Sequence, residues 1–275
     1  MAVRQLMAGT LVAALLLSGC GSSLSGSAGS GGSAGSAETG SAPQQTQAVD
    51  PPLDNAATQD SRSQPLAGVI ICLDAGHGIT SANASERMSP LSQETKPAYV
   101  SGAEGEGQTE EELNLTVAEL TREQLEARGA QVVMTRQSHE ATVSNQERAR
   151  IANDAHADLC IRIHADGAES GQPSGMSMQV PSGSLLGTPA IEQPSAQAAQ
   201  IILQAVTQQT GAQSRGLTPR SDLTGFNWSE VPCVLLEMGF LSNAEENAKL
   251  KTQDYRQKIA EGIAEGVCQW KQSAS

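Results

Sequence analysis

Short apolar runs alternate with segments of helical periodicity along the chain from residue 69 onward. Continuous apolar runs are typical of strands buried on both faces of a sheet, and apolar residues spaced three and four apart indicate helices. The alternation predicts an α/β fold, in which a single domain has a twisted, mostly parallel β-sheet flanked by helices on both faces. The predicted strands are residues 69–73, 131–135, 159–163 and 231–238, and the predicted helices are residues 111–128, 144–156, 196–209 and, with a break, 243–270.

The segment before this domain has a different composition. Residues 21–66 are rich in Gly, Ser, Ala, Gln and Pro and contain almost no large apolar side chains. Such a segment cannot bury enough apolar surface to offset the entropy lost on ordering, so we expect a disordered linker. The predicted organisation is therefore a linker over residues 21–66 followed by one folded domain over residues 67–272.

Residues 1–20 have the pattern of an export signal. A single cation, Arg4, precedes a mostly apolar stretch that is shorter than a membrane-spanning helix and ends in small residues. The closing LSGC resembles the lipobox of bacterial lipoproteins, which implies an exported protein anchored to the cell membrane by lipid on Cys20 and facing the cell wall. An ordinary secretory signal with a chance cysteine is the alternative.

Composition narrows the possible partners. The 275 residues carry a formal net charge of −13, which argues against nucleic acid, because binding to phosphates requires clustered cations. The same charge gives no attraction to an anionic membrane or wall. Attachment to the membrane thus depends on the lipid anchor, and we expect a monomer.

Four polar residues stand at the ends of apolar runs or at a helix start. His77 and His164 each follow a predicted strand, Glu237 ends a third apolar run, and Glu110 opens a helix. Ligand sites in parallel sheets lie at the carboxyl ends of the strands, so we expect these side chains to meet. Two imidazoles and one carboxylate, with a fourth position open, form the ligand set of hydrolytic zinc sites, and a second carboxylate is then free to transfer protons.

The residues alone leave several assignments open. Glu111 and Glu112 stand beside Glu110, and any acid in a first helical turn is favoured by the helix dipole. Asp74 is more simply explained as a turn former at a strand exit. His139 and His156 fall in a loop and at a helix end, so we expect them to be structural or exposed.

Six motifs follow one another in a fixed order along the chain. Together they resemble the zinc-dependent N-acetylmuramoyl-L-alanine amidases of the type-3 amidase family, over residues 69–270. The motifs are LDAGHG, E-x-x-x-N-L, GAQVVMTR, NQERARIAN, ADLCIRIHAD and VPCVLLEMGFLSN.

The resemblance assigns roles to the candidate residues. It implies one zinc ion held by His77, Glu110 and His164, with Glu237 as catalytic acid and base; Glu110 is chosen because it stands four residues before Asn114. It also implies the substrate, the amide between N-acetylmuramic acid and L-alanine in peptidoglycan. Another zinc hydrolase of the exopeptidase type, or a catalytically silent wall-binding lipoprotein, are the alternatives.

Several other positions lie near the predicted site, and their roles stay open. Residues 79–109, long and rich in Gly, Ser and Glu, predict a loop at the rim of the site. Arg162 replaces the serine of the more frequent family pattern, and we expect it to pair with a neighbouring acid rather than a substrate carboxylate. Substrate contact and internal hydrogen bonding explain Arg136, Arg148 and Asn153 equally well.

Four further cysteines, Cys72, Cys160, Cys233 and Cys268, stand in apolar contexts. Cysteine in such contexts behaves as a small hydrophobic residue. Export permits disulfides, and Cys72 and Cys160 become neighbours if their strands pair. Their disulfide state depends on a geometry that sequence does not define.

Overall fold

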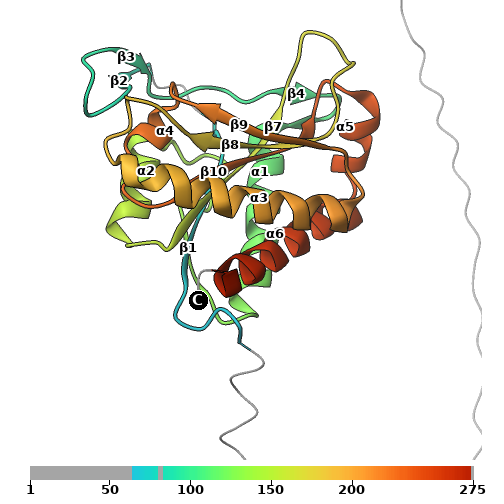
Figure 1. Ribbon diagram of the computed structural model, residues 1–275. Helices are drawn as coiled ribbons and strands as arrows, with labels where there is room; N and C mark the ends of the chain where they lie inside the picture. Colours follow the sequence, from blue (N-terminus) through green and yellow to red (C-terminus); the bar gives the residue numbers. More distant parts are fainter. Residues whose placement is uncertain (1–63, 80–82, 274–275) are drawn as a thin grey trace, which may run out of the picture. The chain divides into compact units, whose positions relative to one another are not determined.

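The computed structural model of the protein describes residues 64–79 and 83–273 (Figure 1). The predicted signal peptide, its Cys20 and the predicted linker up to residue 63 lie outside the described residues. Leu66, which belongs to the expected linker, is fully buried in the core, and its backbone N–H donates to Arg128 O at 2.9 Å. The packed domain therefore already includes residue 66.

Six of the described strands form the central sheet in the order β6-β1-β7-β10-β8-β9. Neighbouring strands run parallel except β10 and β8, which are antiparallel, so the predicted fold class is confirmed. The strands are β1 (Ile70–Ala75), β6 (Gln131–Met134), β7 (Leu159–Asp166), β8 (Met176–Pro181), β9 (Ser214–Arg220) and β10 (Cys233–Phe240).

Helices lie on both faces of this sheet, and each predicted helix is present. Polar side chains cap several helix starts, as Thr109 does for α1, Ser144 for α2 and Asn243 for α5. The helices are α1 (Glu110–Glu126), α2 (Asn145–Asp154), the 3-10 turn η1 (Pro189–Ile191), α3 (Glu192–Thr210), α4 (Thr224–Asn227), α5 (Ala244–Leu250) and α6 (Gln253–Ser273).

The sequence patterns missed β8 and β9. β9 is an edge strand whose residues are mostly polar and include Gly216 and Pro219, so it lacks an apolar run. β8 alternates buried and half-exposed positions next to it. The expected loop over residues 79–109 also contains two small hairpins, made of β2 (Ser85–Arg87) with β3 (Thr95–Pro97) and β4 (Glu104–Gly105) with β5 (Gln108–Thr109).

The two faces of the sheet have different chemistry. The larger apolar core lies between one face and helices α1, α3 and α6, while α2 and α4 cover the other face over a smaller core. Figure 1 shows α3 running across the sheet with α6 beside it. Because side chains alternate along a strand, those on the α2 side include Asp74, Arg162, His164 and Glu237. The candidate catalytic residues of the sheet thus share one face.

Asp74 is the central polar group on that face. Its carboxylate is fully buried and accepts from Arg148 Nη1 at 2.6 Å, Arg162 Nε at 2.7 Å and the Thr135 hydroxyl at 2.6 Å. Burial by itself would raise the pKa of Asp74, but the two guanidinium groups and the hydroxyl outweigh it and hold that pKa far below its ordinary value. The expectation that Asp74 forms a turn is wrong, because the residue lies inside β1 and ties β1 to β7 and α2.

The cysteines of three adjacent strands lie side by side. Cys160 is in register with Cys72 on one side and with Cys233 on the other, so the expected proximity of Cys72 and Cys160 is confirmed. These three residues and Cys268 are buried and free. They act as small core side chains between the sheet and the helices that cover it.

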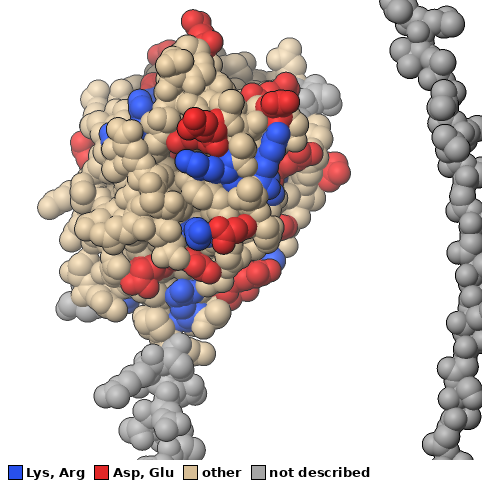
Figure 2. Space-filling model, turned by 90° about the vertical axis from the view of Figure 1, so that its right-hand side faces the viewer, with Lys and Arg blue, Asp and Glu red and all other residues tan. Residues whose placement is uncertain are grey.

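Charged side chains of both signs are interspersed on the surface. On the face shown in Figure 2, basic groups lie directly beside acidic ones, so neither sign forms a continuous patch there. Among the described residues, no helix has the length and apolarity needed to cross a membrane.

We predict that Asp74→Asn destabilises the domain by about 3 to 5 kcal/mol at neutral pH, because it leaves two buried guanidinium groups without their anion. The depressed pKa gives the sign of the pH dependence. In the wild type, the charge of Asp74 contributes fully to the unfolding free energy of the domain above the pKa of this residue in the unfolded chain, about 4. This contribution is lost as the pH falls below that value.

Urea unfolding of both proteins at neutral pH and between pH 4 and 3 checks this prediction. The difference in unfolding free energy between wild type and variant should shrink toward low pH. A difference that does not change with pH would contradict the proposed role of the charge.

Candidate metal centre

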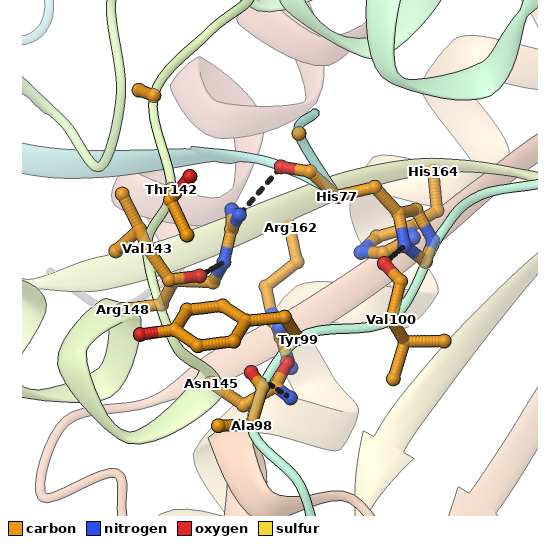
Figure 3. A pocket seen from close by; sticks show the side chains of 12 residues that line it. His77, Ala98, Tyr99, Val100, Thr142, Val143, Asn145, Arg148, Arg162 and His164 are labelled. Carbon is orange, nitrogen blue, oxygen red and sulfur yellow. Dashed lines mark hydrogen bonds between the residues drawn. The ribbon is translucent and has the colours of Figure 1, made fainter. Parts of the chain in front are cut away.

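His77 lies just beyond β1 in a strained conformation. Its φ of 59° is in the left-handed region, which residues other than glycine rarely adopt. The backbone is held there by Arg148, whose Nη2 donates to His77 O at 2.5 Å (Figure 3). On the side chain, Nδ1 lies 2.7 Å from Val100 O. A carbonyl only accepts, so Nδ1 carries the proton and Nε2 keeps a free lone pair for a ligand.

His164 lies on β7 with its ring against Gly76. A Cβ atom at position 76 would lie only 2.3 Å from the ring, so the packing requires glycine there. The rings of His77 and His164 meet edge to face, with centroids 4.8 Å apart and planes 80° apart. The close approach of β1 and β7 thus brings the two imidazoles together.

Glu110 enters the site from the first residue of α1. Its Oε1 accepts from Ala165 N–H and from Asn114 Nδ2, both at 3.2 Å, and its Oε2 accepts from Ala103 N–H at 2.7 Å. Asn114 stands one helical turn later on the same face of α1 and also donates to Gly76 O. The spacing of the E-x-x-x-N motif is therefore the spacing that lets the amide hold the carboxylate.

His77, Glu110 and His164 form a cluster whose donor atoms all lie within 4.8 Å of one another. Glu110 Oε1 is 3.1 Å from His77 Nε2 and 3.0 Å from His164 Nδ1. Zinc bonds of about 2.0 to 2.1 Å place neighbouring ligands of a tetrahedral site about 3.3 Å apart. The Nε2 atom of His164 is buried without a hydrogen-bond partner. The donor set and its spacing therefore fit a small divalent metal ion.

The charge states of the cluster also suit a cation. Burial would raise the pKa of Glu110, but the neighbouring imidazoles of His164 and His77 outweigh it and hold that pKa well below its ordinary value. Burial lowers the pKa of His164 to about 4, despite the opposing effect of Glu110. Burial acts in the same direction on His77, but there Glu110 outweighs it and raises the pKa. A deprotonated carboxylate beside a neutral imidazole is the form that binds metal.

Glu237 lies beside the cluster on β10, with its Cα in register with that of His164. Burial, together with the carboxylates of Glu110 and Asp166, raises the pKa of Glu237 well above its ordinary value. Its Oε1 accepts from Gln179 Nε2 at 2.9 Å, while its Oε2 is buried without a hydrogen-bond partner. One oxygen is thus held in place and the other is available.

Gln179 is itself held by a charged pair. Arg220 Nη1 donates to Gln179 Oε1 at 2.8 Å, so the amide nitrogen of Gln179 must face Glu237. Asp222 accepts from two nitrogens of Arg220, at 2.8 and 3.0 Å. The sequence patterns did not indicate Gln179 and Arg220, because they lie on β8 and β9, for which no strong pattern existed. The antiparallel register of β8 against β10 brings Gln179 to Glu237.

A pocket opens beside the two histidines, and Figure 3 shows its lining. Ala98, Tyr99 and Val100 form one side of it, which confirms that the segment over residues 79–109 contributes to the rim. On the other side, Arg148 donates to Val143 O at 3.1 Å, and Arg162 lies between Arg148 and the histidines. The rim is therefore made of a loop on one side and buried cations on the other.

The other candidates have structural contacts. Arg136 donates to the carbonyls of Ala75 and Gly76, and Asn153 bonds Trp228 O and the N–H of Glu230. Their contacts, like those of Arg148 with Asp74 and the backbone, favour internal hydrogen bonding over substrate contact. Arg162 pairs with Asp74, as expected. His139 and His156 lie outside the cluster of His77, Glu110 and His164.

The fold and the site together define a class of protein. It is an α/β protein in which two histidines and one glutamate, placed to hold a metal ion, lie at the carboxyl edge of a mostly parallel sheet. The chain belongs to the N-acetylmuramoyl-L-alanine amidase family, whose model matches residues 71–269. It is thus an enzyme of the amidase class, and the membership of the amidase family that the sequence motifs indicated is confirmed.

Individual relatives agree with this assignment. The chain is 31% identical over 203 residues to N-acetylmuramoyl-L-alanine amidase LytC of Bacillus subtilis, a match that covers 74% of this chain but only 36% of LytC. It is 26% identical to N-acetylmuramoyl-L-alanine amidase Rv3717 of Mycobacterium tuberculosis, covering 74% of this chain and 86% of the relative. The crystal structure of the amidase Ami1 from Mycobacterium smegmatis superposes with a TM-score of 0.69 at 28% identity, covering 76% of this chain and 99% of Ami1.

We predict that Glu110→Gln and His77→Ala each abolish stoichiometric zinc binding, because each removes one of the three donor groups. The neighbour Glu111 provides a matched control: it lies in the same helical turn but outside the cluster, so Glu111→Gln should bind as much zinc as wild type. Metal analysis of the purified proteins after dialysis measures this directly. Zinc retained by Glu110→Gln and lost by Glu111→Gln would reassign the ligand.

Proposed function

We propose that this protein is a zinc-dependent peptidoglycan hydrolase that cleaves the amide between the lactyl group of N-acetylmuramic acid and L-alanine. The observation that carries the proposal is the cluster of His77, Glu110 and His164 in a chain of the amidase family, with the buried Glu237 on the neighbouring strand. LytC, which the chain resembles in sequence, is named an N-acetylmuramoyl-L-alanine amidase, and Ami1, which it resembles in fold, an N-acetylmuramyl-L-alanine amidase.

In this proposal, His77 Nε2, Glu110 and His164 hold the metal ion. When bound, zinc lowers the pKa of water toward neutrality and polarises a carbonyl. The hydrogen bond from His77 Nδ1 to Val100 O fixes the imidazole tautomer, and the donors around Glu110 fix its carboxylate. These contacts keep the donor atoms in place before substrate arrives, so little reorganisation is needed.

Glu237 is the proton carrier in this proposal. Its free Oε2 accepts the proton of the attacking water and then delivers it to the nitrogen of the departing L-alanine. A carboxyl group whose pKa lies well above the usual range is closer to the working pH, which favours both transfers. The amide is thereby cleaved with addition of one water across the bond.

Gln179 positions this carboxylate. The hydrogen bond to Oε1 leaves Oε2 as the oxygen that meets substrate, and Arg220 keeps the Gln179 amide in the required orientation. Gln179 acts through Glu237 and does not touch the cluster.

We place the reaction outside the cytoplasm. The LSGC motif ending at Cys20 and the polar composition of residues 21–66 support export, a lipid anchor and a tether to the folded domain. Such a tether keeps the domain within reach of the cell wall, where its substrate is found. The anchor and the monomeric state stay predictions.

Digestion of purified peptidoglycan tests the proposal. Wild type should release intact stem peptides that carry a new amino group on L-alanine, which mass spectrometry and amino-group labelling detect. Glu237→Gln should bind an equimolar amount of zinc but lose turnover by about 10² to 10⁴-fold, because the proton carrier is gone.

The products separate the alternatives. Cleavage between amino acids would indicate an exopeptidase-type hydrolase, and zinc-loaded protein that binds wall without releasing peptide would indicate a silent wall-binding protein. Loss of zinc from Glu237→Gln would show instead that Glu237 is itself a metal ligand.

For Gln179 we predict that substitution by Ala lowers kcat about tenfold with KM little changed, because one hydrogen bond to the carboxylate is lost while the binding surface remains. Steady-state kinetics on a soluble muropeptide, with zinc content measured in parallel, provides the readout. A change confined to KM would contradict a positioning role.

A further inference from the structure

A second cavity, of about 220 Å³, opens next to the metal cluster and shares His77 and His164 with it. Lys96 and Pro97 of β3 form one wall, and residues 222–224, before and at the start of α4, form another. Arg162 lines this cavity as well as the pocket of Figure 3. A substrate with its reacting amide at the cluster therefore has room to extend into a space bordered by a cation.

Arg162 has unused donors in this cavity. Its side chain is 5% exposed, and only Nε is engaged, by Asp74. Among the residues that the structure describes, the terminal nitrogens Nη1 and Nη2 make no hydrogen bond. Neither nitrogen is among the fully buried side-chain atoms that lack a partner, so both stay accessible and can donate to the acceptors of a ligand.

Gly225 gives these nitrogens their space. A Cβ at position 225 would lie 2.2 Å from Nη1 of Arg162, so any larger residue would displace the guanidinium. The terminal fork of Arg162 thus lies against α4, whose first residue, Thr224, lines the cavity together with Arg162.

The charges around Arg162 leave a positive excess. Arg162 and Arg148 share the single carboxylate of Asp74, so two cations face one anion. At the opposite rim, Lys96 is already neutralised by Asp222, with Nζ 3.6 Å from Oδ2. Among the residues that line the cavity, Lys96 thus has a carboxylate beside it in Asp222, whereas the anion of Arg162 is shared with Arg148.

The rest of the lining is apolar at Val100, Leu223 and Leu235 and polar at Asn145 and Thr224. A cavity with an apolar side and one forked cation suits a short aliphatic group that ends in a carboxylate, because guanidinium binds carboxylates bidentately. A sugar, with hydroxyl groups around its ring, would leave donors and acceptors unpaired against the apolar side chains.

We propose that this cavity binds a carboxylate of the stem peptide, on the leaving-amine side of the scissile amide, through Nη1 and Nη2 of Arg162. The inference rests on the proposed function, because it assigns the peptide rather than the glycan to this side of the metal cluster. Arg162 then has two roles: Nε supports the fold through Asp74, and the terminal nitrogens select the substrate.

A matched pair of soluble muropeptides tests the proposal. The two differ only in the stem-peptide residue after L-alanine, whose free carboxylate is a carboxamide in the second. For the zinc-loaded wild type we expect kcat/KM to be at least about tenfold higher for the carboxylate form than for the carboxamide form. One charge-assisted hydrogen-bonded pair provides a difference of this size. In Arg162→Gln this ratio should fall to near one.

Two further variants make the result independent of folding defects. Asp222→Asn leaves the buried ion pairs of Asp74 intact and removes a negative charge at the rim, so it should raise the ratio. Arg150→Gln removes an exposed cation of α2 that does not line the cavity, and the ratio should stay at the wild-type value.

The ratio cancels general effects on catalysis, since each protein is compared with itself. A wild-type ratio near one, with both substrates cleaved, overturns the subsite and leaves the proposed function intact. A ratio that persists in folded Arg162→Gln overturns it too, because the carboxylate is then recognised elsewhere. Failure of the wild type to cleave either substrate removes the proposed function itself.

Discussion

The buried carboxylate of Asp74 is the interaction on which the architecture of the site depends. It lies near the carboxyl end of β1 and holds one arginine from α2 and one from β7, so the strand, the helix and the neighbouring strand are joined at a single point. The same arginine of α2 continues to the carbonyl of His77 and holds the backbone in its left-handed conformation. Ion pairs of this kind add specificity of arrangement where an apolar core alone would allow several.

Above this anchor, the site combines elements of two different kinds. The histidines come from the carboxyl ends of neighbouring parallel strands, whereas Glu110 comes from the first residue of a helix that packs on the opposite face of the sheet. The carboxylate reaches the histidines because Asn114 and two backbone N–H groups hold it at the edge. Glu110 and His77 are thus each oriented by hydrogen-bonding groups outside the cluster, as metal sites generally require.

Glu237, the proposed proton carrier, is held by residues of β8 and β9 at the far side of the sheet from β1. The line of contacts from Glu237 through Gln179 and Arg220 to Asp222 reaches Lys96 of the β2–β3 hairpin, which also borders the cavity that we assign to a substrate carboxylate. Groups that orient the proton carrier and groups that shape the substrate cavity are thus connected in one polar network. Two buried atoms of the candidate site, Oε2 of Glu237 and Nε2 of His164, have no hydrogen-bond partner among the described residues.

The sequence by itself determined the fold class, because apolar runs and helical periodicity are local properties that survive without knowledge of contacts. It also placed His77 and His164 at one edge, since every parallel strand ends there, and its motifs identified the family. Only the tertiary structure decided what Asp74 and Gln179 do. Asp74 looked like a turn residue until β6, β7 and α2 surrounded it, and Gln179 had no recognisable role until the antiparallel pairing of β8 with β10 brought it to Glu237. Alternation along a strand tells which face a side chain occupies, but the groups that meet it there come from distant segments, and their meeting depends on strand order, register and the loops that cover the edge.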